Sequence, residues 1–72
     1  MKLLVEFDRE EDGRWIADVA DFPGVLVYGR TRKQALANVQ ALTLAVLAAD
    51  IKHGRRDPET LMQIQFIATK AA

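Results

Sequence analysis

Hydrophobic and polar residues alternate with a period of two in two stretches near the start of the chain, residues 2–8 and 14–20. The hydrophobic positions on one face are, in order, Leu3, Val5, Phe7, Trp15, Ala17 and Val19. Successive side chains of a β-strand point to opposite faces, so this alternation predicts two strands. The loop between them is polar and ends in Asp12-Gly13, a pair typical of hairpin turns. We therefore predict a β-hairpin.

Two further short strands are predicted on either side of a long central segment. Asp21-Phe22-Pro23-Gly24 favours a type II turn over residues 22–25, because proline fixes φ and the following glycine accepts a positive φ. Residues 25–28 form the third strand. Residues 55–59 are a connecting loop, since proline cannot continue a helix. A fourth strand is predicted over residues 61–68, with one face made of Met62, Ile64, Phe66 and Ala68.

A long helix is predicted between residues 31 and 54. Thr31 and Gln34 have the spacing of a capping box, in which each side chain bonds the backbone N–H of the other. Gly54 supplies the residue with positive φ at which helices commonly stop. About 22 residues lie between these ends, which makes a rod of about 33 Å.

This helix is hydrophobic nearly all round its circumference. One stripe, which we expect to pack on the sheet, consists of Ala35, Val39, Leu42, Val46 and Ala49. A second stripe, about 100–140° away, consists of Leu36, Leu44, Leu47 and Ile51. One small sheet covers only one side of such a helix, so we expect a homo-oligomer. The expected interfaces are the second stripe and the exposed edge of the third strand at Val27 and Tyr28.

The predicted order of elements is β-β-β-α-β, a single α+β domain spanning residues 1–72. Short turns make the first three strands an antiparallel meander. The helix then crosses the sheet and returns the chain as a strand parallel to the first, by the right-handed connection that such crossovers take. We therefore expect a two-layer sandwich with sheet order 3-2-1-4 and the first strand at the centre of the core.

The charges of the chain cancel overall but are unevenly distributed. Residues 1–24 contain three basic and seven acidic residues, whereas residues 25–72 contain seven basic and three acidic residues. An acidic first third can attract a basic partner at long range. The alternative is a hairpin that is simply solvated. The candidate partner-binding residues are Glu10, Glu11, Asp12, Asp18 and Asp21.

Few residues in the sequence suit catalysis. There is no cysteine and one histidine, His53, which suits a helix C-terminus, so we expect no metal site, no cofactor and no enzymatic activity. The carboxylates Asp8, Asp18, Asp21 and Asp50 lack the convergence that a two-metal nuclease needs. We see no signal peptide, and polar residues interrupt the longest apolar region, so we expect a soluble cytoplasmic protein without membrane contact.

Three features of residues 1–50 together resemble the HicB-like antitoxin family. They are the acidic hairpin, the Asp21-Phe22-Pro23-Gly24 turn, and Gly29-Arg30-Thr31 before a helix with the run Ala35-Leu36-Ala37-Asn38. The family pattern is a D-[LF]-P-G turn, a short strand, G-D-T and a helix beginning E-E-A-L-x-N-A. The helix start departs from this pattern, because basic residues replace commonly acidic ones: Arg30, Arg32 and Lys33.

The resemblance implies a partial RNase H-like fold and a protein antitoxin. Proteins of this family bind a small basic RNase toxin, HicA, and occlude its active site, so a HicA-type toxin is the implied partner. Many members also carry a C-terminal DNA-binding domain. Because this sequence ends shortly after the predicted fourth strand, we expect no operator binding.

Two other functions stay open. A nucleic-acid-binding protein could use the basic residues at the helix start and in the following loop: Arg30, Arg32, Lys33, Arg55 and Arg56. A degenerate RNase H-like nuclease is the second alternative, which the carboxylate pattern disfavours. We expect no appreciable binding to duplex DNA at physiological salt, since the acidic hairpin cancels the net charge and no helix is free to enter a groove.

Overall fold

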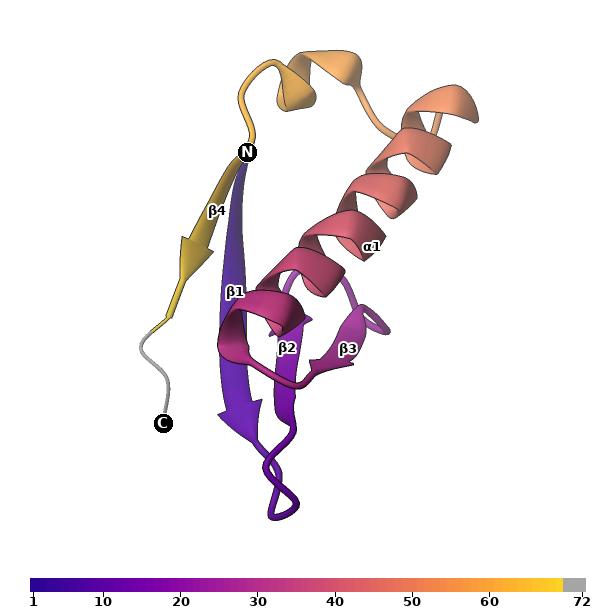
Figure 1. Cartoon of the computed structure of the whole chain (residues 1–72). Coiled ribbons are helices and arrows are strands. Elements are labelled where there is room, and N and C mark those ends of the chain that lie inside the picture. The colour runs from indigo at the N-terminus through magenta and orange to yellow at the C-terminus, as the bar shows by residue number, and fades with distance from the viewer. Residues whose placement is uncertain (70–72) are drawn as a thin grey trace.

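The strands and the helix follow one another in the predicted order. The structure, a computed structural model, describes residues 1–69. Figure 1 shows one long helix lying across one face of a four-stranded sheet. The elements are β1 (Lys2–Arg9), β2 (Trp15–Val19), β3 (Leu26–Gly29), α1 (Arg32–Lys52), the short 3₁₀ helix η1 (Pro58–Leu61) and β4 (Gln65–Ala68).

The sheet has the order β3-β2-β1-β4. β2 pairs antiparallel with both β1 and β3, and β4 pairs parallel with β1. The register places Val5 opposite Val19 and Leu3 opposite Phe66, so hydrophobic residues of neighbouring strands share one face. The predicted two-layer α+β arrangement and strand order are confirmed, with β1 in the interior of the sheet.

Two tight turns connect the antiparallel strands. The loop between β1 and β2 is closed by a hydrogen bond of 2.8 Å from the Glu10 N–H to the Arg14 carbonyl. Between β2 and β3, the Val25 N–H donates to the Phe22 carbonyl at 3.0 Å, and Gly24 has a φ of 90°. The second turn therefore has the features of the predicted type II turn.

α1 begins and ends where the sequence predicts. The Thr31 hydroxyl accepts a hydrogen bond from the Gln34 N–H at 3.0 Å. The Gln34 side chain also reaches back, but it accepts from the Arg30 N–H, at 2.7 Å, and not from that of Thr31. At the other end His53 caps the helix and Gly54 takes a φ of 70°. Local sequence signals thus fix both helix ends.

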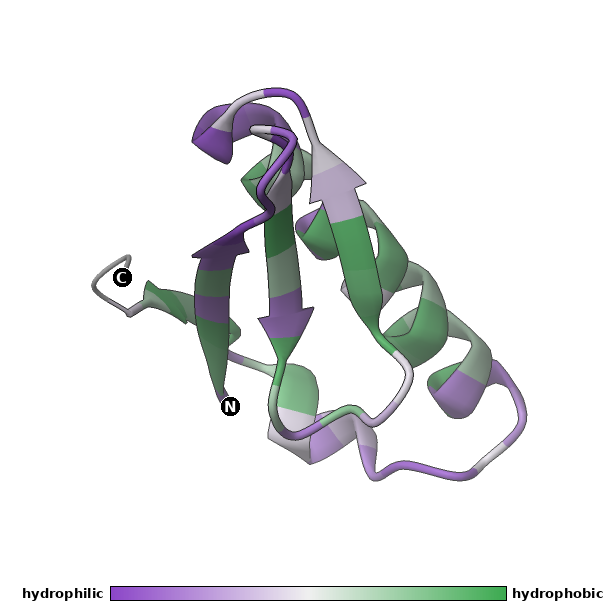
Figure 2. Ribbon diagram, turned by 90° about the horizontal axis from the view of Figure 1, so that it is seen from below, coloured by the Kyte–Doolittle hydropathy of each residue, from purple (hydrophilic) through white to green (hydrophobic). Residues whose placement is uncertain are grey.

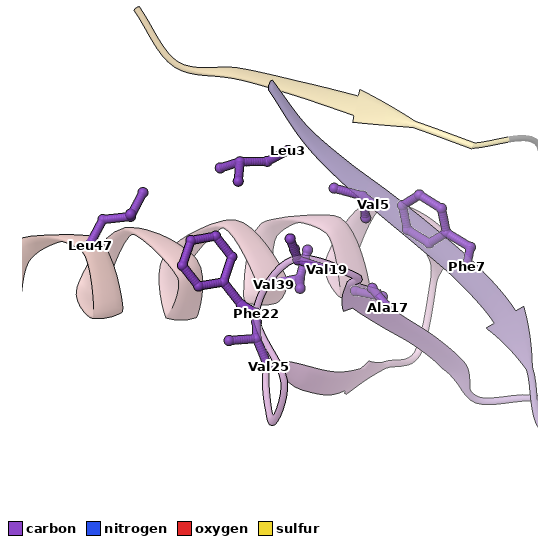
Figure 3. Close-up of a cluster of buried hydrophobic side chains, with 10 residues drawn as sticks. Leu3, Val5, Phe7, Ala17, Val19, Phe22, Val25, Val39 and Leu47 are labelled. Atoms are coloured by element: carbon purple, nitrogen blue, oxygen red, sulfur yellow. The ribbon is translucent and has the colours of Figure 1, made fainter. Parts of the chain in front are cut away.

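The hydrophobic core lies between α1 and one face of the sheet. Figure 3 shows its side chains gathered between β1, β2 and the helix. Strands, turn and helix all contribute buried residues, namely Leu3, Val5, Phe7, Ala17, Val19, Phe22, Val25, Ala35, Val39 and Leu47. The half-buried Trp15 packs edge-to-face on Phe7, with ring centroids 6.5 Å apart. The alternating positions of the two predicted strands therefore face inward as expected.

The face of α1 that packs on the sheet differs from the predicted one. Its buried residues lie four apart: Ala35, Val39, Thr43 and Leu47. The expectation that Leu42 lies in the core is wrong, because Leu42 is 37% exposed, whereas Leu47, expected at the surface, is 2% exposed. Thr43 is fully buried, and its hydroxyl donates to the Val39 carbonyl at 2.7 Å, so its polar group is satisfied inside the core.

The second predicted stripe is accordingly divided between core and surface. Leu44 stays exposed, at 45%, while Leu36 and Ile51 are half-buried and Leu47 belongs to the core. The sheet faces the arc of the helix that lies between the two predicted stripes, so each stripe contributes part of the core. Of the two edge residues, Tyr28 is exposed and Val27 packs against the core.

The fourth strand is shorter than predicted. Residues 58–61 form η1, because Pro58 opens a helical turn and the Asp57 carboxylate caps it, accepting from the Glu59 N–H at 3.0 Å. β4 therefore begins at Gln65, and the residues before it do not join the sheet. Met62, predicted to lie on the hydrophobic face of this strand, is 78% exposed.

By length and composition alone, α1 is apolar enough to cross a membrane. One such helix is a weak indication, because core helices of soluble proteins share these properties. In the described part of the chain one side of α1 is buried against the sheet. The cytoplasmic location expected from the sequence stays a prediction.

Candidate protein-binding surface

The face of the sheet that points away from α1 carries alternating acidic and hydrophobic side chains. Figure 2 shows hydrophilic and hydrophobic bands along β1 and β2. Side chains that alternate with the core positions lie on this face, and no helix within residues 1–69 covers it. We call it the open sheet face; its residues include Leu4, Glu6, Asp8, Ile16, Asp18, Leu26, Tyr28 and Ile67.

Strand pairing brings the acidic residues of this face together. Glu6 of β1 is directly opposite Asp18 of β2, and Asp8 lies on the same face two residues further along β1. Like charges at directly opposite positions destabilise a sheet. Within residues 1–69 the ion pairs join Asp12 to Arg14 and Asp50 to two arginines, so Glu6, Asp8 and Asp18 have no cationic partner there.

A depression of about 340 Å³, open to solvent, lies on this face. Its lining combines carboxylates with hydrophobic groups: Glu6, Phe7, Asp8, Ile16, Asp18 and Leu26. The apolar residues around it are only partly covered, since Leu26 is 49% and Tyr28 is 43% exposed. The surface can therefore offer both negative charge and apolar contact to another molecule.

Two cations border this face without neutralising its carboxylates. The Arg14 guanidinium lies 4.5 Å from the centroid of the Tyr28 ring and pairs with Asp12 at 2.7 Å. Lys2 lies at the start of β1, opposite Gln65. The depression thus keeps its three charges.

Of the residues predicted to bind a partner, only Asp18 lines the depression. Glu10, Glu11 and Asp12 lie in the loop between β1 and β2, and Asp21 lies in the turn after β2. The Asp12 carboxylate already has partners within the chain. It accepts one hydrogen bond from the Arg14 backbone N–H and one from the Arg14 side chain, and both lower the pKa of the Asp12 carboxyl, the backbone bond more strongly.

Glu6 and Asp8 were missed because they occupy the polar positions of an ordinary amphipathic strand. The signal that could have found them is the hairpin register, which aligns Glu6 with Asp18.

The basic residues proposed for nucleic-acid binding do not form one free surface. The Arg32 guanidinium lies 4.2 Å from the centroid of the Phe7 ring. Arg55 and Arg56 pair with Asp50 at 3.1 Å and 3.3 Å. The hydrogen bond from Arg55 has the largest effect on the pKa of the Asp50 carboxyl, and both bonds lower it. Three of the five are therefore engaged within the chain.

The nuclease alternative would need several carboxylates gathered around metal ions. Across residues 1–69 no group of three or more histidine, aspartate or glutamate side chains is arranged to hold a metal ion. The open-face carboxylates Glu6, Asp8 and Asp18 are neighbours on the sheet without forming such a group.

Comparison with known proteins identifies a relative. The chain is 33% identical over 58 residues to a UPF0150 protein of the archaeon Thermoplasma acidophilum, an alignment that covers 81% of this chain and 84% of the relative. No family model matches the chain, and no solved structure does so either. The RNase H-like part of the predicted fold therefore rests on the sequence resemblance alone. Identity at this level across most of both sequences places the chain in the UPF0150 family.

Proposed function

We propose that this protein is a non-enzymatic binding module of the HicB-like antitoxin type, which binds and occludes a small basic RNase toxin. Two sequence observations support the proposal: membership of the UPF0150 family and the resemblance of residues 1–50 to HicB-like proteins. The structural observation that carries it is the open sheet face, with three carboxylates that lack cationic partners in the described part of the chain.

The charge of this face favours a basic partner. Glu6 and Asp18 repel one another across β1 and β2 in the free protein, and a cation brought by a partner would turn this repulsion into attraction. Long-range attraction between an acidic and a basic protein also speeds association. A small RNase must carry positive charge to bind RNA, so an acidic surface that competes with RNA fits an inhibitor.

Affinity capture tests the proposal. The tagged protein would be expressed in its native host, recovered at low salt and eluted with rising salt. We expect a small basic protein of about the same size to co-purify in roughly equal amount and to be released as salt rises, since exposed charge pairs are screened. The captured partner, once separated from the tagged chain, should cleave RNA, and the tagged chain should inhibit that cleavage.

Other results would contradict the proposal. A captured protein whose RNase activity is unchanged by this chain would show that the chain is not its antitoxin. Recovery of nucleic acid alone, with sub-micromolar and salt-sensitive binding in a gel-shift titration, would favour the nucleic-acid alternative.

A further inference from the structure

We propose that the depression on the open sheet face receives an arginine side chain from a basic, partly hydrophobic segment of the protein partner. This inference rests on the proposed function, in that it assumes a protein partner, and it names the surface that the partner contacts. It moves the contact from the predicted hairpin tip, with Glu10, Glu11 and Asp12, to the middle of the sheet around Glu6 and Asp18.

The spacing of the carboxylates suits one guanidinium. Directly opposite residues have Cβ atoms about 4.5–5.5 Å apart, and next neighbours on one face of a strand are about 6.6–6.8 Å apart. Glu6 and Asp18 occupy directly opposite positions and Asp8 is the next residue on this face of β1, so one guanidinium in the depression can bond the Glu6 and Asp18 carboxylates and lie beside Asp8. The planar guanidinium has five N–H donors in a fixed fork and bonds a carboxylate through two parallel N–H···O bonds, whereas a lysine ammonium acts as a compact point charge.

The hydrophobic part of the lining suits the stem of the same side chain. Ile16 and Leu26 lie beside the carboxylates in the depression, and Leu4 and Tyr28 extend the apolar surface on the same face. Arginine packs its methylene groups on apolar surface while its charged end bonds to polar groups. Hydrophobic residues next to the arginine would cover the exposed Leu26 and Tyr28.

The arginines next to this face are engaged elsewhere in the chain. Arg14, which borders this face, is paired with Asp12 and lies over Tyr28 at the edge of the sheet. Arg9, although on β1, points to the other face and lies 5.4 Å from the centroid of the Trp15 ring. A second copy of this chain presenting the same face would place carboxylates against carboxylates, which is repulsive.

A peptide titration followed by NMR tests this site without the toxin. The probe is the synthetic peptide acetyl-Leu-Arg-Leu-Arg-amide, and its control replaces both arginines with citrulline, a neutral residue of the same shape. We expect the arginine peptide to shift the backbone amide signals of the residues that line the depression, and to bind at least tenfold more tightly than the citrulline peptide.

Two double variants that remove the same amount of charge distinguish binding in the depression from a general effect of the protein's negative charge. Glu6→Gln with Asp18→Asn removes two carboxylates from the depression, and Glu11→Gln with Asp21→Asn removes two exposed carboxylates outside it. We expect the first pair to weaken arginine-peptide binding about tenfold and the second pair less than threefold. Circular dichroism checks that each variant is folded, and the single variant Glu6→Gln replaces the first pair if that pair fails to fold.

The outcomes distinguish this inference from the proposed function. Equal weakening by both pairs, equal binding of the two peptides, or signal shifts confined to the loop between β1 and β2 would overturn the inference. None of these results bears on whether a toxin is captured and inhibited. Conversely, if the Glu6→Gln, Asp18→Asn variant inhibits the captured toxin as well as the native chain does, that result would overturn this site while leaving the antitoxin assignment intact.

Discussion

At the scale of single residues, the positions that give the resemblance to HicB-like proteins hold the junction between β3 and α1. Thr31 caps the helix, and the Asn38 side chain donates to the Tyr28 carbonyl at 2.9 Å on the edge strand. Gly29 lies against the backbone of Ala35, where a Cβ atom would collide. These residues therefore specify the fold, and the carboxylates of the proposed binding site lie elsewhere on the sheet.

Gly29→Ala should destabilise the protein. The new Cβ atom would lie 2.8 Å from the Ala35 Cα, so the start of α1 would have to move away from β3. Crowding of this kind costs about 1–3 kcal/mol. Because Gly29 does not have a positive φ, alanine would otherwise stabilise by about 0.4–1 kcal/mol. Urea denaturation measures the change in the free energy of unfolding. A variant as stable as the native protein would contradict the close contact between residue 29 and Ala35.

Glu6→Gln should have the opposite effect. Removing one of two like charges at directly opposite positions should raise the free energy of unfolding by about 0.2–1 kcal/mol in low salt, and salt should reduce the gain. Glu11→Gln, in the loop between β1 and β2, is the matched control and should change little. Chemical denaturation at two salt concentrations measures both. A loss of stability in Glu6→Gln would mean that the carboxylate has a stabilising partner.

At the scale of elements, the sequence predicts the strands and the helix ends well and the buried face of the helix poorly. The period-two pattern of β1 and β2 and the caps of α1 are local signals. The helix is apolar on most sides, so composition alone does not distinguish Leu42 from Leu47. A threonine satisfied by the carbonyl four residues earlier can be buried, and Thr43 is an example.

The fourth strand and the candidate site show the same limit. Residues 61–68 alternate in the same way as β1, although less regularly, but the Asp57 cap and Pro58 favour a helical turn before the strand begins. In the site, Glu6, Asp8 and Asp18 could each be predicted as outward residues of their strands. Their position side by side becomes visible only when the register between strands is known.

Self-association through the outer face of α1 remains a proposal, now based on a corrected set of residues. Leu42 and Leu44 are exposed beside exposed alanines, whereas Leu47 is buried. Leu44→Glu should give a folded protein that associates less, because it adds charge to the surface alone. Leu47→Glu should unfold the protein, since it places a charge in the core. Sedimentation and circular dichroism measure the two effects. A native protein that is monomeric at tens of micromolar would contradict the proposal.

Asp50→Asn should make stability depend less on pH. Hydrogen bonds from Arg55 and Arg56 lower the pKa of the Asp50 carboxyl in the folded state. Stability from this carboxylate is therefore present above its unfolded pKa and is lost as pH falls through the folded value. Thermal unfolding should show the variant less stable than the native protein at pH 7 and equally stable near pH 2. An equal difference at both pH values would mean that the loss is not ionic.

At the scale of the whole molecule, each of the two layers is covered on its inner side only. The molecule measures 40 × 19 × 17 Å along its principal axes. Within residues 1–69 this thin shape leaves Leu42 and Leu44 exposed on α1, and Leu4, Leu26 and Tyr28 exposed on the open sheet face. Small domains bury a limited share of their surface, so partners commonly add stability. The acidic face and the neutral helix face differ in chemistry and suit different partners.

Growth rescue is the most direct test of the claim that the open sheet face neutralises a basic toxin. The captured toxin would be expressed in a bacterial host together with the native chain or one of the two double variants. We predict that the native chain and the Glu11→Gln, Asp21→Asn variant restore growth. The folded Glu6→Gln, Asp18→Asn variant, expressed at the same level, should fail to do so. Full rescue by that variant, or no rescue by the native chain, would contradict the claim.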